Sequence, residues 1–139
     1  MPPDTDTVQF RVRYSETDRM DAVYNSRVLE WFEVGRTEWT RSMGLPYAEV
    51  EERGILLPIV EAHVEFKGRA SYDDLLEMET SVSMPSRLKV RFDVTIDHAN
   101  RDDRVASGYT LHAVTNTDGK PVRPPTWLLD VLQGGEGQE

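Results

Sequence analysis

Three carboxylates lie close together in the segment that precedes the longest amphipathic stretch of the chain. Glu16, Asp18 and Asp21 fall within six residues, just before an expected helix that begins near Asn25. A carboxylate can act as a nucleophile or general base, and free N–H groups at a helix start can stabilise an oxyanion. The pattern is therefore compatible with an acyl-transfer site. A solvated acidic loop is the simpler alternative, because acidic residues are common near helix starts for dipole reasons.

A row of cations stands out in a chain that is otherwise acidic. The 139 residues carry 16 Lys and Arg against 25 Asp and Glu, which gives a formal charge of −9. Arg87, Lys89 and Arg91 alternate with apolar residues, so a strand would place all three on one face. Such a row could contact the phosphates of a ligand, and a solvated strand face explains the pattern equally well.

Other catalytic and metal-binding patterns are missing from the sequence. Because there is no Cys, thiolate nucleophiles, disulfides, zinc fingers and iron–sulfur clusters are excluded. The motifs of serine hydrolases, zinc proteases, P-loop proteins and dinucleotide-binding proteins do not occur. His63 lies between Glu61 and Glu65 and could join a divalent-ion site, although strand alternation already explains this spacing. We expect no metal and no organic cofactor.

Length and composition indicate one domain. Hydrophobic residues make up 38% of the chain, which is enough for one core. We expect residues 1–139 to form a single domain with an ordered core over about residues 8–132 and loose ends. The acidic charge disfavours nucleic acid and membrane as partners. No apolar run approaches the roughly 18 residues of a membrane helix, and no signal-peptide pattern occurs, so a cytoplasmic location is expected.

One long helix is the strongest local prediction. Apolar residues recur at spacings of three and four from Val28 to Met43, which predicts an amphipathic helix over residues 25–43. Gly44 and then Pro46 would end it. Gly35 lies on the apolar face, where the absence of a side chain indicates close approach to a packed sheet. A short helix is expected over residues 47–53.

The rest of the chain alternates with a period of two. Half-buried strands are predicted over residues 60–66, 76–83, 88–96 and 105–115, and Phe10, Val12 and Tyr14 indicate another strand before the helix. A short closing helix is expected over residues 126–132. This order favours an α+β fold in which an antiparallel β-sheet covers one long central α-helix.

Several blocks of the sequence resemble a known family. Residues 13–25 (RYSETDRMDAVYN) continue into residues 29–38 (LEWFEVGRTE), and LPIVE at 57–61 and ASYDDLLE at 70–77 follow in order. Together they look like the signature of hotdog-fold acyl-CoA thioesterases of the 4-hydroxybenzoyl-CoA thioesterase type. The resemblance covers roughly residues 8–132, and the family's antiparallel sheet wrapped around a long helix agrees with the order of elements above.

The resemblance implies an activity and assigns roles to residues. It implies hydrolysis of an acyl- or aroyl-CoA thioester to free acid and CoA, with Asp18 as the nucleophile or general base and the Asn25 N–H holding the carbonyl oxygen. It supports Arg87, Lys89 and Arg91 as contacts for the CoA phosphates. Asp21, Asn25 and Val28 differ from the usual family pattern.

The resemblance also implies an assembly, and it leaves alternatives open. Members of the family pair their sheets edge to edge, so a homodimer or homotetramer is expected. A thioesterase acting on acyl carrier protein is one alternative activity, and a hotdog module that binds acyl-CoA without hydrolysing it is another.

Overall fold

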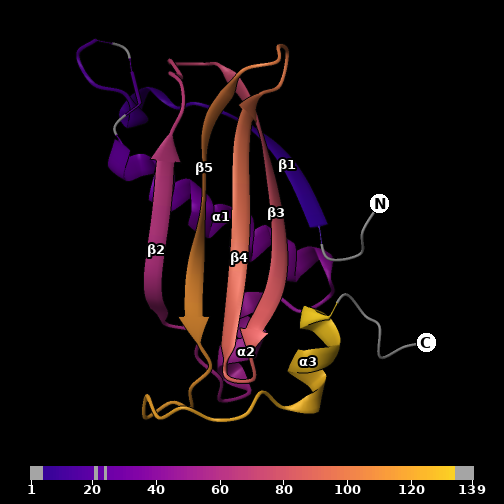
Figure 1. Ribbon diagram of the computed structural model, residues 1–139. Coiled ribbons are helices and arrows are strands. Elements are labelled where there is room, and N and C mark those ends of the chain that lie inside the picture. The colour runs from indigo at the N-terminus through magenta and orange to yellow at the C-terminus, as the bar shows by residue number, and fades with distance from the viewer. Residues whose placement is uncertain (1–4, 21, 24, 134–139) are drawn as a thin grey trace.

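The computed structural model describes residues 5–20, 22, 23 and 25–133. Figure 1 shows the strands lying side by side in one sheet, with a long helix crossing one face of it. In the described part, no helix combines the length and apolar character needed to cross a membrane. The elements, in chain order, are β1 (Thr5–Arg11), a 3-10 helix η1 (Tyr14–Glu16), α1 (Asn25–Ser42), α2 (Tyr47–Glu52), β2 (Ile59–Phe66), β3 (Leu75–Ser86), β4 (Lys89–His98), β5 (Arg104–Ala113) and α3 (Thr126–Leu132).

The five strands form one antiparallel sheet in the order β1-β3-β4-β5-β2. The connections from β3 to β4 and from β4 to β5 are short hairpins, whereas β2 lies at the far edge, beside β5. The expected α+β arrangement of an antiparallel sheet around one long helix is confirmed. The order also places the start of β2 and the β3–β4 turn at the same end of the sheet (Figure 1).

The apolar stripe of α1 packs on the sheet as the spacing predicts. Trp31, Phe32 and Trp39 are buried, with Phe32 and Trp39 fully enclosed. At Gly35 a Cβ would lie 2.5 Å from the Thr80 Oγ1 of β3, so only glycine allows this close approach without movement of the sheet side chains. This confirms the reason expected for a glycine on the apolar face.

The first strand differs from its prediction. It runs from Thr5 to Arg11, and Tyr14 lies in η1 and is exposed. Thr5–Thr7, expected to be loose, pair with β3, with Thr5 opposite Ser81. The polar composition of this segment hid the strand, because backbone hydrogen bonds to β3 hold it in place without a large apolar side chain.

Strand β2 is also less buried than its alternation indicated. Most of its residues are exposed, including Ile59 at 49%, Val60 at 53% and Phe66 at 49% of their surface. Among the described strands, β2 pairs only with β5, so its other edge presents unpaired backbone groups beside apolar side chains. The expectation of a half-buried strand is therefore wrong for an edge strand of the single chain.

Candidate active site

Asp18 is held by a tight turn of its own backbone. Its Oδ1 accepts hydrogen bonds from the N–H groups of Met20 at 2.8 Å and Ala22 at 3.1 Å. The Asp18 N–H in turn donates to the Ala22 carbonyl at 2.8 Å. Among the described residues, the hydrogen bonds of this carboxylate all involve Oδ1, so Oδ2 remains available to a ligand.

Asp18 and Asn25 line the same cavity, which we name the Asp18 cavity. It has a volume of about 230 Å³. Asn25 is the first residue of α1, where the N–H groups of the first turn lack intrahelical partners and the helix dipole favours negative charge. The structure therefore brings together both residues to which the resemblance assigned catalytic roles. The remaining lining residues are Ala22, Val23, Val28, Phe66, Gly68, Arg69, Ala70 and Val105.

The neighbouring acid Glu16 has a different role. Its side chain is buried and accepts hydrogen bonds from the Arg13 N–H at 2.8 Å and the Trp31 indole N–H at 2.9 Å. Burial alone would raise the pKa of Glu16, but these hydrogen bonds and the Arg13 guanidinium outweigh it and lower the pKa. Glu16 thus connects the Asp18 segment to α1 through hydrogen bonds. Asp21, the third acid of the segment, lies outside the described residues.

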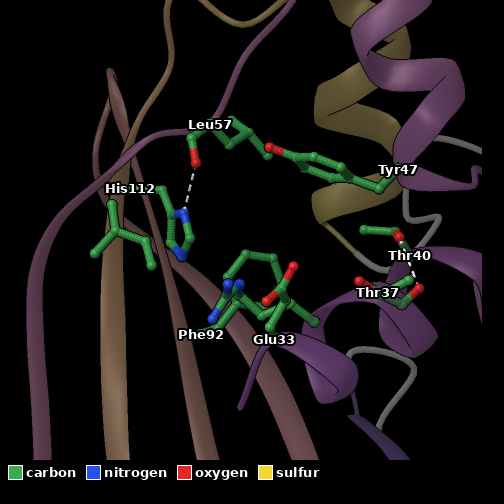
Figure 2. Close-up of a pocket in the computed structure, with 9 residues that line it drawn as sticks. Glu33, Thr37, Thr40, Tyr47, Leu57, Phe92 and His112 are labelled. Carbon is green, nitrogen blue, oxygen red and sulfur yellow. Dashed lines mark hydrogen bonds between the residues drawn. The ribbon is translucent and has the colours of Figure 1, made fainter. Parts of the chain in front are cut away.

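A second cavity lies further along α1 and was not anticipated from the sequence. We name it the Arg36 cavity, and its volume is about 130 Å³ (Figure 2). Within the described part of the chain, the Arg36 Nη1 atom is buried and has no hydrogen-bond partner. The other lining residues are Glu33, Thr37, Thr40, Tyr47, Leu57, Ile59, Phe92 and His112.

His112 is a neutral, fully engaged member of this cavity. Its Nδ1–H donates to the Leu57 carbonyl at 2.8 Å (Figure 2). Its Nε2 accepts from the Thr110 hydroxyl at 2.9 Å. Burial lowers the pKa of His112 to about 4, although the Leu57 carbonyl acts in the opposite direction. His112 therefore adds no positive charge to the cavity at neutral pH.

This neutral histidine predicts acid sensitivity of the fold. The unfolded chain protonates the imidazole near pH 6.5, whereas the folded chain does so only near pH 4, so acidification between these values favours unfolding. The neutral state of His112 contributes about 3 kcal/mol to the free energy of unfolding. This contribution is present in full above pH 6.5 and is lost by pH 4. Urea unfolding of wild type and His112→Gln at pH 7 and pH 4.5 measures it. We expect a weaker pH dependence in the variant, and equal pH dependence in both proteins would contradict the assignment.

Arg87 is separated from the predicted cationic row. It lies in the β3–β4 turn, whereas Lys89 and Arg91 lie two residues apart on β4 and share a face. Arg87 lies in a groove of about 490 Å³ between the β3–β4 turn and α3, which it shares with Arg123. Arg91 instead pairs with Asp93 at 3.0 Å and stacks over the Tyr109 ring, 3.9 Å from its centroid. Arg123 was missed because it follows the strand-rich region in a proline-rich segment with no periodic pattern.

The suggested ion site on β2 is a stacked surface cluster. His63 stacks on Tyr109, with ring centroids 5.6 Å apart, and its Nε2 lies 3.2 Å from a Glu65 oxygen. The Tyr109 hydroxyl donates to Glu61. The simpler interpretation, a hydrogen-bonded strand face, accounts for these contacts.

Comparison with known proteins decides the family. A model described as the thioesterase-like superfamily matches residues 12–132. The chain belongs to this superfamily. Among solved structures, a DHNA-CoA thioesterase from Staphylococcus aureus has a TM-score of 0.85 at 26% identity, over 96% of this chain and 90% of that chain. The hotdog fold implied by the resemblance is confirmed.

Two relatives of the chain are CoA-thioester hydrolases by name. A 1,4-dihydroxy-2-naphthoyl-CoA hydrolase of Synechococcus elongatus is 26% identical over 125 residues, covering 88% of this chain and 90% of that protein. The 4-hydroxybenzoyl-CoA thioesterase of a Pseudomonas species is 33% identical over 79 residues, or 55% of this chain and 56% of that protein. The chain is thus an acyl-CoA thioesterase-like hotdog protein.

Proposed function

We propose that the protein hydrolyses a small-molecule acyl- or aroyl-CoA thioester to the free acid and CoA. The observation that carries this proposal is the shared cavity of Asp18 and the start of α1, in a chain whose relatives are acyl-CoA thioesterases by name. Thioester hydrolysis needs a carboxylate and N–H donors, and Asp18 and the first residue of α1 line one cavity there.

In this proposal the Asn25 N–H donates a hydrogen bond to the thioester carbonyl oxygen and stabilises the negative charge that develops on it. The free Oδ2 of Asp18 either attacks the acyl carbon or takes a proton from a water that attacks it. The C–S bond then breaks, and the CoA sulfur leaves as a thiolate that takes a proton from Asp18 in the general-base route or from solvent after direct attack. If Asp18 attacks directly, water hydrolyses the resulting anhydride and restores the carboxylate.

Release of free thiol from a panel of acyl-CoA and aroyl-CoA thioesters tests the proposal. We expect turnover of at least one CoA thioester, and faster turnover than of the same acyl group on acyl carrier protein. An acidic carrier would be repelled by a chain of charge −9. Tight binding of acyl-CoA without thiol release would identify a non-catalytic binding module instead.

A homodimer formed through β2 is part of the proposal. The exposed edge of β2 carries apolar side chains, and pairing with a second β2 about a twofold axis would satisfy its backbone groups. We expect light scattering at micromolar concentration to give twice the 15.9 kDa chain mass, or four times for a dimer of dimers. Val60→Lys should weaken the assembly, whereas Thr7→Lys, at an exposed position of β1 on the opposite edge of the sheet, should not. A 15.9 kDa wild-type particle would contradict the proposal.

Such a dimer would complete the site from two chains. Antiparallel pairing of two β2 strands sets the Phe66 end of one strand, beside the Asp18 cavity, against the Ile59 end of the other. The β3–β4 turn of the partner lies at that same end. Arg87 and Lys89 of one chain, with Arg123 beside Arg87, would then hold the phosphates of a CoA bound at Asp18 of the other.

The phosphate role of Arg87 and Lys89 predicts a change in KM. Replacing both by Ala should raise KM for CoA thioesters about tenfold with kcat little altered, because phosphate contacts act on binding rather than on the reacting bond. Initial rates at two salt concentrations measure it, and the wild-type KM should rise with salt. Arg91→Ala should have a smaller effect, since Asp93 already pairs with Arg91. An unchanged KM in the double variant would contradict the phosphate role and show that Arg87 and Lys89 are solvated surface residues.

A further inference from the structure

The Arg36 cavity contains a half-buried guanidinium whose Nη1 atom is buried and has no hydrogen-bond partner among the described residues. Among the described residues, Arg36 forms no ion pair within 4 Å, and its Nη1 lacks any hydrogen-bond acceptor. Burial lowers the pKa of Arg36, and Glu33 partly offsets this, yet a guanidinium remains charged at neutral pH. A buried N–H donor left unsatisfied is destabilising, and a charged one more so. A ligand that supplies an acceptor would remove this penalty.

None of the other polar groups of the cavity accepts a hydrogen bond from the Arg36 Nη1 among the described residues, and the Glu33 carboxylate, which is exposed, forms no ion pair with it within 4 Å. The Thr40 hydroxyl donates to the Thr37 carbonyl (Figure 2). Both His112 nitrogens are hydrogen-bonded, to the Leu57 carbonyl and the Thr110 hydroxyl. Burial raises the pKa of Tyr47, although a hydrogen bond with the Leu57 backbone opposes it, so the phenol keeps its proton. Arg36 and Tyr47 therefore offer hydrogen-bond donors to a ligand in the cavity, and the carboxylate of Glu33 lies on its exposed side.

Size limits the occupant to a small group. The volume of about 130 Å³ equals that of about four water molecules. A carboxylate with two or three methylenes fills such a space, whereas a long alkyl chain does not. Phe92 and Ile59 supply apolar contacts for the methylenes.

The position of the cavity decides which catalytic residue it can serve. Ile59 at the start of β2 borders the Arg36 cavity, and Phe66 at its end borders the Asp18 cavity of the same chain. These ends are roughly 23 Å apart in an eight-residue strand, too far for a short acyl group. Antiparallel β2 pairing brings the Arg36 cavity next to the Asp18 cavity of the partner.

We propose that the Arg36 cavity binds the terminal carboxylate of a short dicarboxylic acyl-CoA and presents its thioester to Asp18 of the other subunit. This inference rests on the proposed thioesterase function and on the β2 dimer. Arg36 is a specificity determinant here, and Tyr47 supplies a second donor to the same carboxylate.

Matched pairs of thioesters test the selectivity. We expect kcat/KM for succinyl-CoA and glutaryl-CoA to exceed that for butyryl-CoA and valeryl-CoA by about 30-fold, the effect of a charge-assisted hydrogen bond. Arg36→Met should abolish this preference while its valeryl-CoA rate stays within about threefold of wild type. Arg41→Met, on the same helix but exposed and paired with Glu38, should retain the preference.

The outcomes separate the inference from the function on which it rests. Hydrolysis of the monoacyl thioesters with no dicarboxylic preference, or an equal loss on both substrate types in Arg36→Met, overturns the inference and leaves the thioesterase proposal intact. No hydrolysis of any thioester overturns both. If Arg36→Met does not fold, Arg36→Lys replaces it and should retain part of the preference, because the charge remains with fewer planar donors.

A mixing experiment tests the contribution of the second subunit. The Asp18→Asn and Arg36→Met chains are unfolded together in equal amounts and refolded, so that mixed dimers form. If a site takes Asp18 from one chain and Arg36 from the other, one of the two sites in each mixed dimer keeps both native residues. We then expect about a quarter of the wild-type glutaryl-CoA rate, because half of randomly paired dimers carry one intact site. A rate equal to the average of the two separate variants would show that Arg36 acts within its own chain, and would overturn this part of the inference.

Discussion

Replacing Asp18 by Asn should lower kcat for CoA thioesters by at least ~10²-fold, the low end of the effect of general base catalysis. Asn keeps the size of the side chain and an oxygen that can accept the hydrogen bonds of Met20 and Ala22. It removes the negative charge at Oδ2, the atom that the turn leaves available. The substitution therefore separates the chemistry of the carboxylate from its structural role in the loop.

Initial rates together with thermal midpoints measure this effect. Asp118→Asn, in an exposed turn after β5, is the matched control and should leave both unchanged. Asp21→Gly should retain turnover, since a carboxylate so close to a helix start is favoured by the dipole alone. Full activity in a folded Asp18→Asn protein, with loss in Asp21→Gly, would assign the chemistry to the other acid.

Replacing Gly108 by Ala should lower the free energy of unfolding more than any other substitution considered above. A Cβ at this position in β5 would lie 2.0 Å from the His63 carbonyl oxygen and 3.0 Å from the Val64 Cα, both backbone atoms of β2. No side-chain rotation can relieve that clash, so β2 must move away from the sheet. We expect a loss of about 3 kcal/mol or more and a fall in the thermal midpoint of about 10 °C.

Gly35→Ala is the matched comparison, because its obstacles are side-chain atoms. The added Cβ would lie 2.5 Å from the Thr80 Oγ1 and 3.3 Å from the Met78 sulfur, and Met78 in particular can adjust. Alanine also favours the helix by ~1 kcal/mol over glycine. Calorimetry of both variants should show the larger loss for Gly108→Ala and, if β2 forms the dimer, dissociation as well. A smaller loss at Gly108 than at Gly35 would contradict the analysis.

The elements with a strong apolar period were predictable from the sequence. The 3.6-residue spacing of α1 and the two-residue spacing of β3, β4 and β5 each record one buried face, and the structure buries those faces. The start of β1 and the exposure of β2 were not predictable in this way. The start of β1 is fixed by its pairing with β3, and the exposure of β2 follows from its position at the edge of the sheet. Neither feature is encoded in a local sequence pattern.

In the candidate site, too, only the features that depend on local structure were predictable from the sequence. Asp18 and Asn25 are close in sequence and flank a helix start, so their proximity followed from local structure. Arg36 lies off the apolar row of α1 and reads as a solvent-facing residue. Its burial depends on α2 and on the segment around Leu57, which return to the helix only in the folded chain.

The Glu16–Trp31 hydrogen bond has a consequence for how such a protein could change over evolution. Together with the Val23 N–H, which donates to the Ala70 carbonyl at 3.1 Å, it secures the Asp18 loop to residues that do not line the Arg36 cavity. Side chains around Arg36, Tyr47 and Leu57 can therefore be exchanged without disturbing the loop. For the proposed function, this separation means that a few substitutions around Arg36 would change the acyl specificity while the Asp18 loop is inherited unchanged.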